Sequence, residues 1–254
     1  MKRYQLQFFF VWTLVEQSWA FQSQVPFRYN HAGESKSGYS PRYLGKIQKS
    51  VLQAKRSPTG DFELQELKAQ VESIRRQGVA SKALPPTKRF ELETYAKGVI
   101  ENKASPVPLE QVGTRLAGTK WRLVFSTENA ALSSLPSDAT VVLDFLDDTN
   151  MNYSLIFGEK TAGLNKIVAK STWTAGQGNN FDSGRNPGLV SMVYDKITCD
   201  AFGLSNIGIG FFGLLKGRAS YIQTVYFDNE IWIDGGYAPD GSTYFSIYTR
   251  EKTL

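Results

Sequence analysis

In residues 116–127, LAGTKWRLVFST, apolar side chains begin to recur at every second position of the chain. Trp121, Leu123 and Phe125 occupy alternate positions there, and such alternation is typical of a β-strand. The same period continues toward the C-terminus, in segments separated by residues common in turns, such as 147–150 and 239–241. We predict strands at residues 121–126, 141–145, 151–157, 166–174, 189–198, 219–227, 231–234 and 243–250.

About eight short strands, with no helical period among them, predict a mainly β domain. Because an open antiparallel sheet of this size would leave two edges exposed, we expect the sheet to close as a barrel or a sandwich over residues 116–254. Residues 61–115 precede it as a helical part of the domain. One amphipathic helix is expected over 61–78, where apolar residues form a stripe, and a second over 87–102, between two pairs of prolines.

Positive charge is concentrated at the N-terminus. The formal net charge is +5, yet residues 1–60 hold nine of the 29 basic residues and two of the 24 acidic ones, so the rest of the chain is mildly acidic. A basic start, an apolar run and small residues predict a signal peptide over 1–20, and the Ser-rich, basic residues 21–60 have the composition of a transit peptide. Together these two segments predict a two-part plastid presequence. The alternative is a secreted protein that carries a basic arm. The acidic body predicts no nucleic-acid partner.

The chain has one cysteine, Cys199, and one histidine, His31, which we expect to leave with the presequence. A mature chain without histidine has no Ser-His-Asp or Cys-His site and no His-ligated metal, and a single cysteine forms no internal disulfide. We therefore expect no catalytic residue, metal or cofactor. The adjacent acids Asp147 and Asp148 lie in a predicted turn, where we expect them to be solvated rather than to act as an acid–base pair.

Residues 208–213, GIGFFG, match the dinucleotide-binding pattern GxGxxG, and Asp234 follows at about the spacing of its ribose-binding acid. That pattern needs a helix directly after it, whereas β-branched residues follow here and only 41 residues remain. We interpret the segment as a Gly-rich loop. Its apolar side chains belong either to the core or to a lip at a ligand portal or membrane surface, with Ile209, Phe211, Phe212 and Leu214 as the candidate lip residues.

Trp121 at the start of the first strand and Arg250 at the end of the last resemble the pair that closes the base of lipocalin-like barrels, where the arginine stacks on the indole. The run 116–127 resembles the opening of the plastid lipid-associated protein (fibrillin) family. Residues 226–233 and 244–250, YFDNEIWI and YFSIYTR, resemble that family's last hairpin. The chain departs from the family in one extra residue before Trp121, in Trp232 where an arginine is usual, and in residues 160–186, which match nothing in it.

The resemblance implies an antiparallel, lipocalin-like β-barrel of about eight strands that binds fatty acids, carotenoids or other lipids in plastids, at thylakoids or plastoglobules, and catalyses no reaction. The alternative is a chromophore (bilin) lyase-like enzyme on a related barrel. The expected partners are a lipid or other apolar small molecule and, peripherally, a membrane. Trp121, Tyr244, Tyr248 and Arg250 are the candidate ligand-binding residues, because the last three share one face of a strand. Two partners are open for Arg250, a ligand carboxylate and the Trp121 indole.

Overall fold

The computed structural model describes residues 58–75, 84–127, 139–158, 163–177, 185–209, 216–217, 219–237 and 243–251. Three helices come first, α3 (Pro58–Ile74), α5 (Pro86–Asn102) and α6 (Val112–Leu116), with a 3-10 turn η1 (Leu109–Gln111) before α6. The strands are β1 (Lys120–Ser126), β2 (Thr140–Phe145), β3 (Asn150–Ile156), β4 (Leu164–Gln177), β5 (Arg185–Ala201), β6 (Leu204–Gly208), β7 (Ala219–Phe227), β8 (Ile231–Tyr237) and β9 (Thr243–Arg250). The expected signal peptide lies outside the described residues, as does the transit segment up to residue 57.

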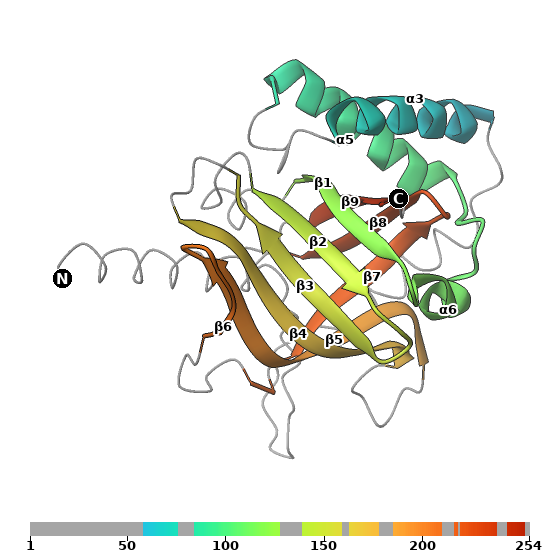
Figure 1. Ribbon diagram of the computed structural model, residues 1–254. Helices are drawn as coiled ribbons and strands as arrows, with labels where there is room; N and C mark the ends of the chain where they lie inside the picture. The colour runs from blue at the N-terminus through green and yellow to red at the C-terminus, as the bar shows by residue number, and fades with distance from the viewer. Residues whose placement is uncertain are drawn as a thin grey trace, which may run out of the picture.

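The strands pair antiparallel in one sheet, in the order β4-β3-β2-β1-β9-β8-β7-β5-β6. Because β5 also pairs with β4, eight of these nine strands form a closed ring of hydrogen-bonded neighbours. Figure 1 shows β2, β3 and β4 on the near side of the ring, with β7, β8 and β9 behind them. The first strand meets the last at the β1–β9 pairing, where Trp121 lies opposite Arg250. The predicted mainly β, antiparallel domain is therefore confirmed.

Alternate side chains of the strands face the interior of the ring and its outside. A β-bulge between Leu123 and Phe125 shifts this alternation in β1, so that Trp121 and Leu123 pack inside while Phe125 packs outside. Apolar side chains from β1 to β5 and from β7 to β9 fill the interior, and the buried apolar residues of α6 pack against them. Gly118, with a φ of 70° that few other residues adopt, lets the chain turn from α6 into β1.

The helices α3 and α5 lie side by side and cover the outside of the ring at β1 and β7 to β9 (Figure 1). Leu67, Val71 and Ile74 form the buried stripe of α3 that the sequence predicts. They pack with buried residues of α5 and of the strands, namely Leu92, Ala96, Val99, Phe125, Tyr226, Ile233 and Ile247. This second apolar cluster fixes β8 and β9 from outside, and so positions the side chains on their inner face.

Two short elements escape the sequence prediction, α6 and β6. The five residues of β6 are all exposed, and the strand pairs with the C-terminal part of β5. It ends at Gly208, the first glycine of the GxGxxG match, and residues 210–215 lie outside the described part of the chain. The sheet of the described residues is antiparallel throughout, which agrees with the interpretation that this match is not a dinucleotide site.

Candidate functional site

Five buried aromatic side chains close one end of the ring, and we call them the aromatic floor: Trp121, Phe145, Trp173, Phe227 and Trp232. Trp121 and Trp232 meet edge to face, with ring centroids 5.8 Å apart, and Phe227 lies 5.2 Å from Trp121. Phe145 lies between Trp173 and Trp232, at 4.7 and 6.1 Å. All three indole N–H groups donate a hydrogen bond to a neighbouring oxygen, at 2.8 to 3.0 Å. The floor therefore buries its polar atoms without leaving them unpaired.

A carboxyl group, that of Asp234, faces the interior beside this floor. Asp234 follows Trp232 by two residues on β8, and therefore lies on the same face, opposite Ser246 of β9. The Ser246 backbone N–H donates to Asp234 Oδ1 at 2.7 Å, and the Tyr248 hydroxyl donates to Oδ2 at 3.3 Å. The Ser246 hydroxyl in turn lies 3.1 Å from that of Ser126 on β1. Asp234, Ser246, Tyr248 and Ser126 form a polar patch, the Asp234 cluster, in the wall of the ring.

The charge of Asp234 is poorly compensated. Burial raises the pKa of this carboxyl from 3.8 to about 7, although the hydrogen bonds from Ser246 and Tyr248 act in the opposite direction. The buried polar residues of the described chain include no Lys or Arg, and the ion pairs recorded for it do not involve Asp234. An ionised Asp234 is thus a negative charge in an apolar surrounding without a cationic partner among the described residues.

Tyrosine rings flank Asp234 on both sides along the inner face of β8 and β9. In this pair of strands Trp232 lies opposite Tyr248, Asp234 opposite Ser246, and Gly236 opposite Tyr244. The Tyr244 ring covers Gly236 so closely that a Cβ at that glycine would come within 2.6 Å of its Cζ. On the other side the Tyr248 ring lies 5.0 Å from Trp232. Asp234 therefore lies between two positions of the sheet that carry tyrosine rings.

At the end of the ring opposite the floor the described residues are also buried, with slightly more exposed surface. Trp121 and Trp232 are 0% exposed, whereas Tyr153 and Phe157, farther along β3 and just beyond it, keep 6% and 7% of their surface, and Asp234 keeps 5%. The Ser171 hydroxyl is buried on the inner face of β4 without a hydrogen-bond partner. The connections at this end, residues 128–138, 159–162 and 238–242, lie outside the described part of the chain.

Three of the four candidate ligand-binding residues lie in this interior. Trp121 belongs to the floor, Tyr248 to the Asp234 cluster, and Tyr244 is half-buried beside that cluster. Sequence alternation therefore places both tyrosines on the correct face. Sequence reasoning misses Asp234 as a site residue, although it occupies an inward position of the predicted strand 231–234, where an apolar side chain is expected.

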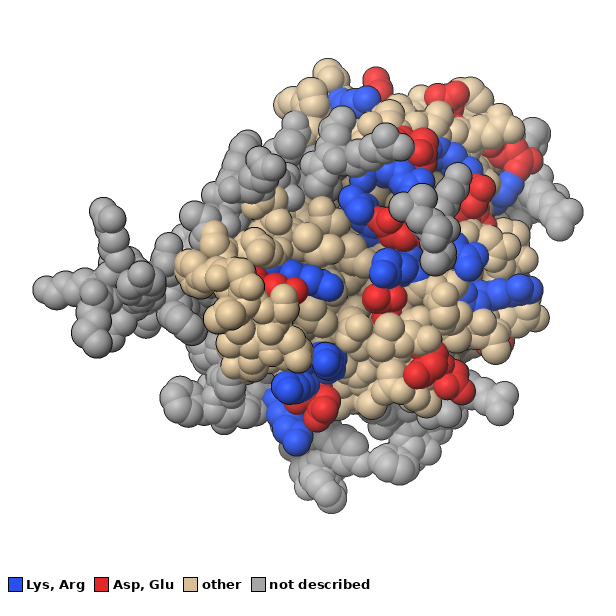
Figure 2. All heavy atoms as spheres, viewed as in Figure 1, with Lys and Arg blue, Asp and Glu red and all other residues tan. Residues whose placement is uncertain are grey.

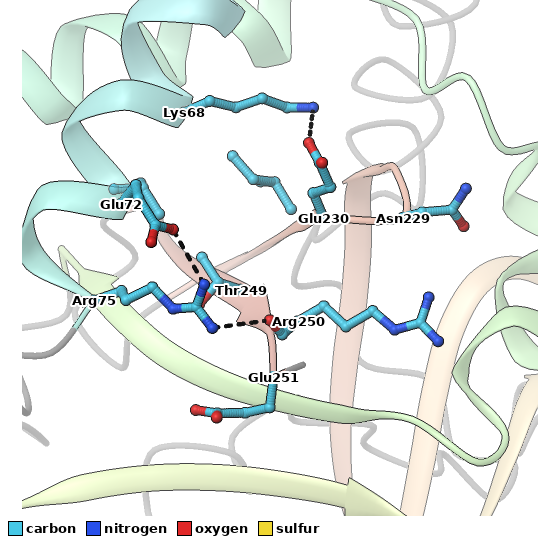
Figure 3. Close-up of a pocket in the computed structure, with 10 residues that line it drawn as sticks. Lys68, Glu72, Arg75, Asn229, Glu230, Thr249, Arg250 and Glu251 are labelled. Atoms are coloured by element: carbon cyan, nitrogen blue, oxygen red, sulfur yellow. Dashed lines mark hydrogen bonds and ion pairs between the residues drawn. The ribbon is translucent and has the colours of Figure 1, made fainter. Parts of the chain in front are cut away.

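Arg250 does not join the other three. Its residue is exposed, its side chain extends away from α3 in Figure 3, and its backbone N–H donates to the Glu230 carbonyl at 3.1 Å. The cation–π contact recorded within the described residues joins Arg89 to Phe125 instead. Strand register brings Arg250 opposite Trp121, but neither stacking on the indole nor a place in the interior is observed for its guanidinium.

Of the four candidate lip residues, only Ile209 lies in the part of the chain that the structure describes. Ile209 is half-buried against the interior apolar cluster, and its backbone N–H donates to the Ile197 carbonyl at 2.9 Å. Phe211, Phe212 and Leu214 lie outside the described residues. At the β5–β6 turn, at the other end of β6 from Ile209, Phe202 and Leu204 are 65% and 64% exposed. The role of the predicted lip stays a prediction.

The acids of the β2–β3 turn and the single thiol lack the properties of catalytic groups. The Asn150 side chain and the backbone N–H groups of Thr149 and Asn150 donate to Asp147 and lower its pKa to about 2, so it holds no proton near neutral pH. The predicted solvated turn is therefore confirmed. Burial and the neighbouring Asp200 raise the pKa of the Cys199 thiol, the opposite of what a nucleophilic thiolate needs.

A hollow of about 500 Å³ lies outside the ring between α3 and the ends of β8 and β9 (Figure 3). Its charged side chains pair with one another: Lys68 lies 2.6 Å from Glu230, and Arg75 lies 3.1 Å from Glu72. Arg75 also donates to the Arg250 carbonyl at 3.4 Å. These charges are largely balanced within the groove, whereas the Asp234 carboxyl on the inner face of the ring has no cationic partner among the described residues.

Basic and acidic side chains are interspersed over the face drawn in Figure 2, which lacks the basic stripe that phosphate-backbone binding needs. Within the described ranges, no three acidic, His or Cys side chains are grouped so as to hold a metal ion, and no helix is sufficiently long and apolar to cross a membrane. No family model and no curated protein matches the chain.

Proposed function

We propose that the ring is a lipocalin-like barrel that binds an apolar small molecule in its interior and catalyses no reaction. The observation that carries this proposal is the combination of a largely apolar inner wall, an aromatic floor at one end and the Asp234 cluster, flanked by tyrosine rings. Binding pockets for small molecules share this composition, because apolar walls supply affinity and a few polar groups fix orientation. A ring of eight strands is wide enough for one such ligand.

We further propose that the chain belongs to the plastid lipid-associated protein (fibrillin) family and acts in plastids, at thylakoids or plastoglobules. Support comes from the sequence of α6 and β1, which resembles the family's opening, and from the last hairpin that pairs with it. A peripheral membrane contact, at the predicted lip or at the exposed apolar residues of the β5–β6 turn, would be consistent with this location. Among the lipids that the family binds, fatty-acid anions fit this interior least, because the buried Asp234 carboxylate would repel them.

Native mass spectrometry of the purified full chain, followed by solvent extraction, tests the proposed binding. We expect one apolar molecule per chain to be retained, and a fluorescent apolar probe to bind the extracted protein with the same stoichiometry. A chain that carries no ligand and binds no apolar probe while it remains folded would refute the proposal.

The enzymatic alternative rests on one specific observation. A carboxyl with a pKa of about 7, such as that of Asp234, has the value that a general acid needs near neutral pH. A lyase-like enzyme would attach a bilin to an acceptor protein, and Asp234→Asn would abolish that reaction. A change in the bilin absorption spectrum on mixing with the wild-type chain and an acceptor, lost in the variant, would favour the enzyme over the carrier.

A further inference from the structure

We infer that the ligand carries a cationic amine head, which the Asp234 carboxylate holds between the rings of Tyr244 and Tyr248. This inference rests on the proposed binding of an apolar molecule in the ring, and adds the chemical class of its head group. It starts from the position of Asp234 on the inner face of β8, between Trp232 and Gly236, with Ser246 directly opposite.

Charge complementarity is the first reason for a cation. Asp234 is 5% exposed, and the buried polar residues of the described chain include no Lys or Arg that could balance it. The hydrogen bonds from Ser246 and Tyr248 satisfy its oxygen atoms in part but add no positive charge. An ammonium group that enters the interior would supply this charge and form charge-assisted hydrogen bonds, which are stronger than bonds between neutral groups.

The aromatic surroundings of Asp234 are the second reason. The Tyr244 ring covers Gly236 on one side, the Tyr248 ring lies over Trp232 on the other, and Tyr153 is near enough to contribute to the raised pKa of Tyr248. The faces of tyrosine rings attract cations, and a carboxylate among such rings is a setting that favours an ammonium head. A neutral hydroxyl head would gain a hydrogen bond alone, and a carboxylate head would be repelled.

The test compares three ligands that share one apolar tail: dodecylamine, dodecanol and dodecanoate. Each displaces a fluorescent apolar probe from the full chain at pH 8, below its critical micelle concentration. We expect dodecylamine to bind at least tenfold more tightly than dodecanol, with dodecanoate weakest. In Asp234→Asn the amine should lose this tenfold advantage, while the affinity for dodecanol changes less than threefold. The control Asp148→Asn, which removes the same charge from an exposed turn, should retain the wild-type preference.

The outcomes separate the two proposals. Equal affinities for all three ligands in the wild-type chain would overturn the amine inference and leave the binding function intact, whereas no binding of any of them would overturn the binding function. Should Asp234→Asn fail to fold, Tyr244→Leu provides a second variant, because it removes an aromatic face but keeps an apolar side chain. It should weaken the amine more than the alcohol, and an equal loss for both would contradict the inference.

Discussion

Asp234→Asn should stabilise the ligand-free protein above pH 7. The folded chain raises the pKa of this carboxyl to about 7, whereas in the unfolded chain it returns to about 3.8. The difference is about three pKa units, and at 1.36 kcal/mol per unit the ionised carboxyl destabilises the fold by about 4 kcal/mol. The amide that replaces it carries no charge and keeps an acceptor for the Ser246 backbone N–H.

The pH dependence has a definite sign. Between about pH 4 and pH 7 the folded chain retains the Asp234 proton while the unfolded chain has lost it, so the wild-type free energy of unfolding falls as the pH rises through this range. Below pH 4 both states hold the proton, and above pH 7 both have released it. The contribution of Asp234 to the free energy of unfolding therefore does not change with pH below pH 4 or above pH 7. The Asn variant lacks the contribution at every pH.

Urea denaturation of the extracted chain from pH 4.5 to 8.5 measures this difference. The curves of wild type and Asp234→Asn should diverge with rising pH and then run parallel above about pH 7, with the variant the more stable by a few kcal/mol. Because all other groups are shared, they cancel in the comparison, and Asp148→Asn should follow the wild-type curve. A difference that is constant with pH would show that Asp234 titrates normally, and would refute the reasoning from its burial.

Three further predictions concern packing and targeting. Trp121→Ala should lower the free energy of unfolding by about 3 to 5 kcal/mol, since the residue is fully buried, whereas Phe90→Ala, at a 71% exposed site, should change it by less than about 0.5 kcal/mol; equal effects in chemical denaturation would contradict the floor. Gly113→Ala should cost about 1 to 3 kcal/mol, because its new Cβ would lie 2.7 Å from that of Ala175, while Gly208→Ala meets open space and should leave the thermal midpoint unchanged; a Gly113→Ala protein as stable as wild type would show that α6 packs loosely. Residues 1–60 fused to a fluorescent reporter should carry it into a plastid, and a reporter found in the growth medium would instead favour the secreted alternative.

The fold was largely predictable because the inward-facing positions of its strands are mostly apolar. Each of the eight ring strands presents apolar residues on alternate positions, and this period appears directly in the sequence. The strand β6 has no buried face to impose such a period, since all five of its residues are exposed. The helix α6 spans five residues between Pro108 and Gly118, too few to show a helical period. The strand β6 is held by pairing with the adjacent strand β5, and α6 by packing against β4 and β5, which are distant in sequence.

The site was predictable only in part, because its chemistry depends on pairing across strands. The alternation of side chains along each predicted strand is enough to place Trp121, Tyr244 and Tyr248 on the inward face. The partners of Asp234 lie 12 and 14 residues away on the next strand, and sequence does not show which register brings them to it. The prediction that Arg250 joins the interior site is not met, for a related reason. Alternation places Arg250 on the same face of the strand as Tyr244 and Tyr248, but at the end of the strand its side chain is exposed to solvent.

The meeting of the first strand with the last determines when this chain can fold. Trp121 of β1 pairs with Arg250, 129 residues later, so the ring cannot close before the final strand is available. The apolar faces of α3 and α5, although made early, find their buried partners on β7, β8 and β9 and must wait as well. Such a high contact order slows folding and prolongs exposure of apolar surface. A chain that emerges N-terminus first from a ribosome therefore keeps these apolar surfaces exposed until its last residues appear, and removal of β9 alone would leave β1 and β8 without a pairing partner at the point where the ring closes.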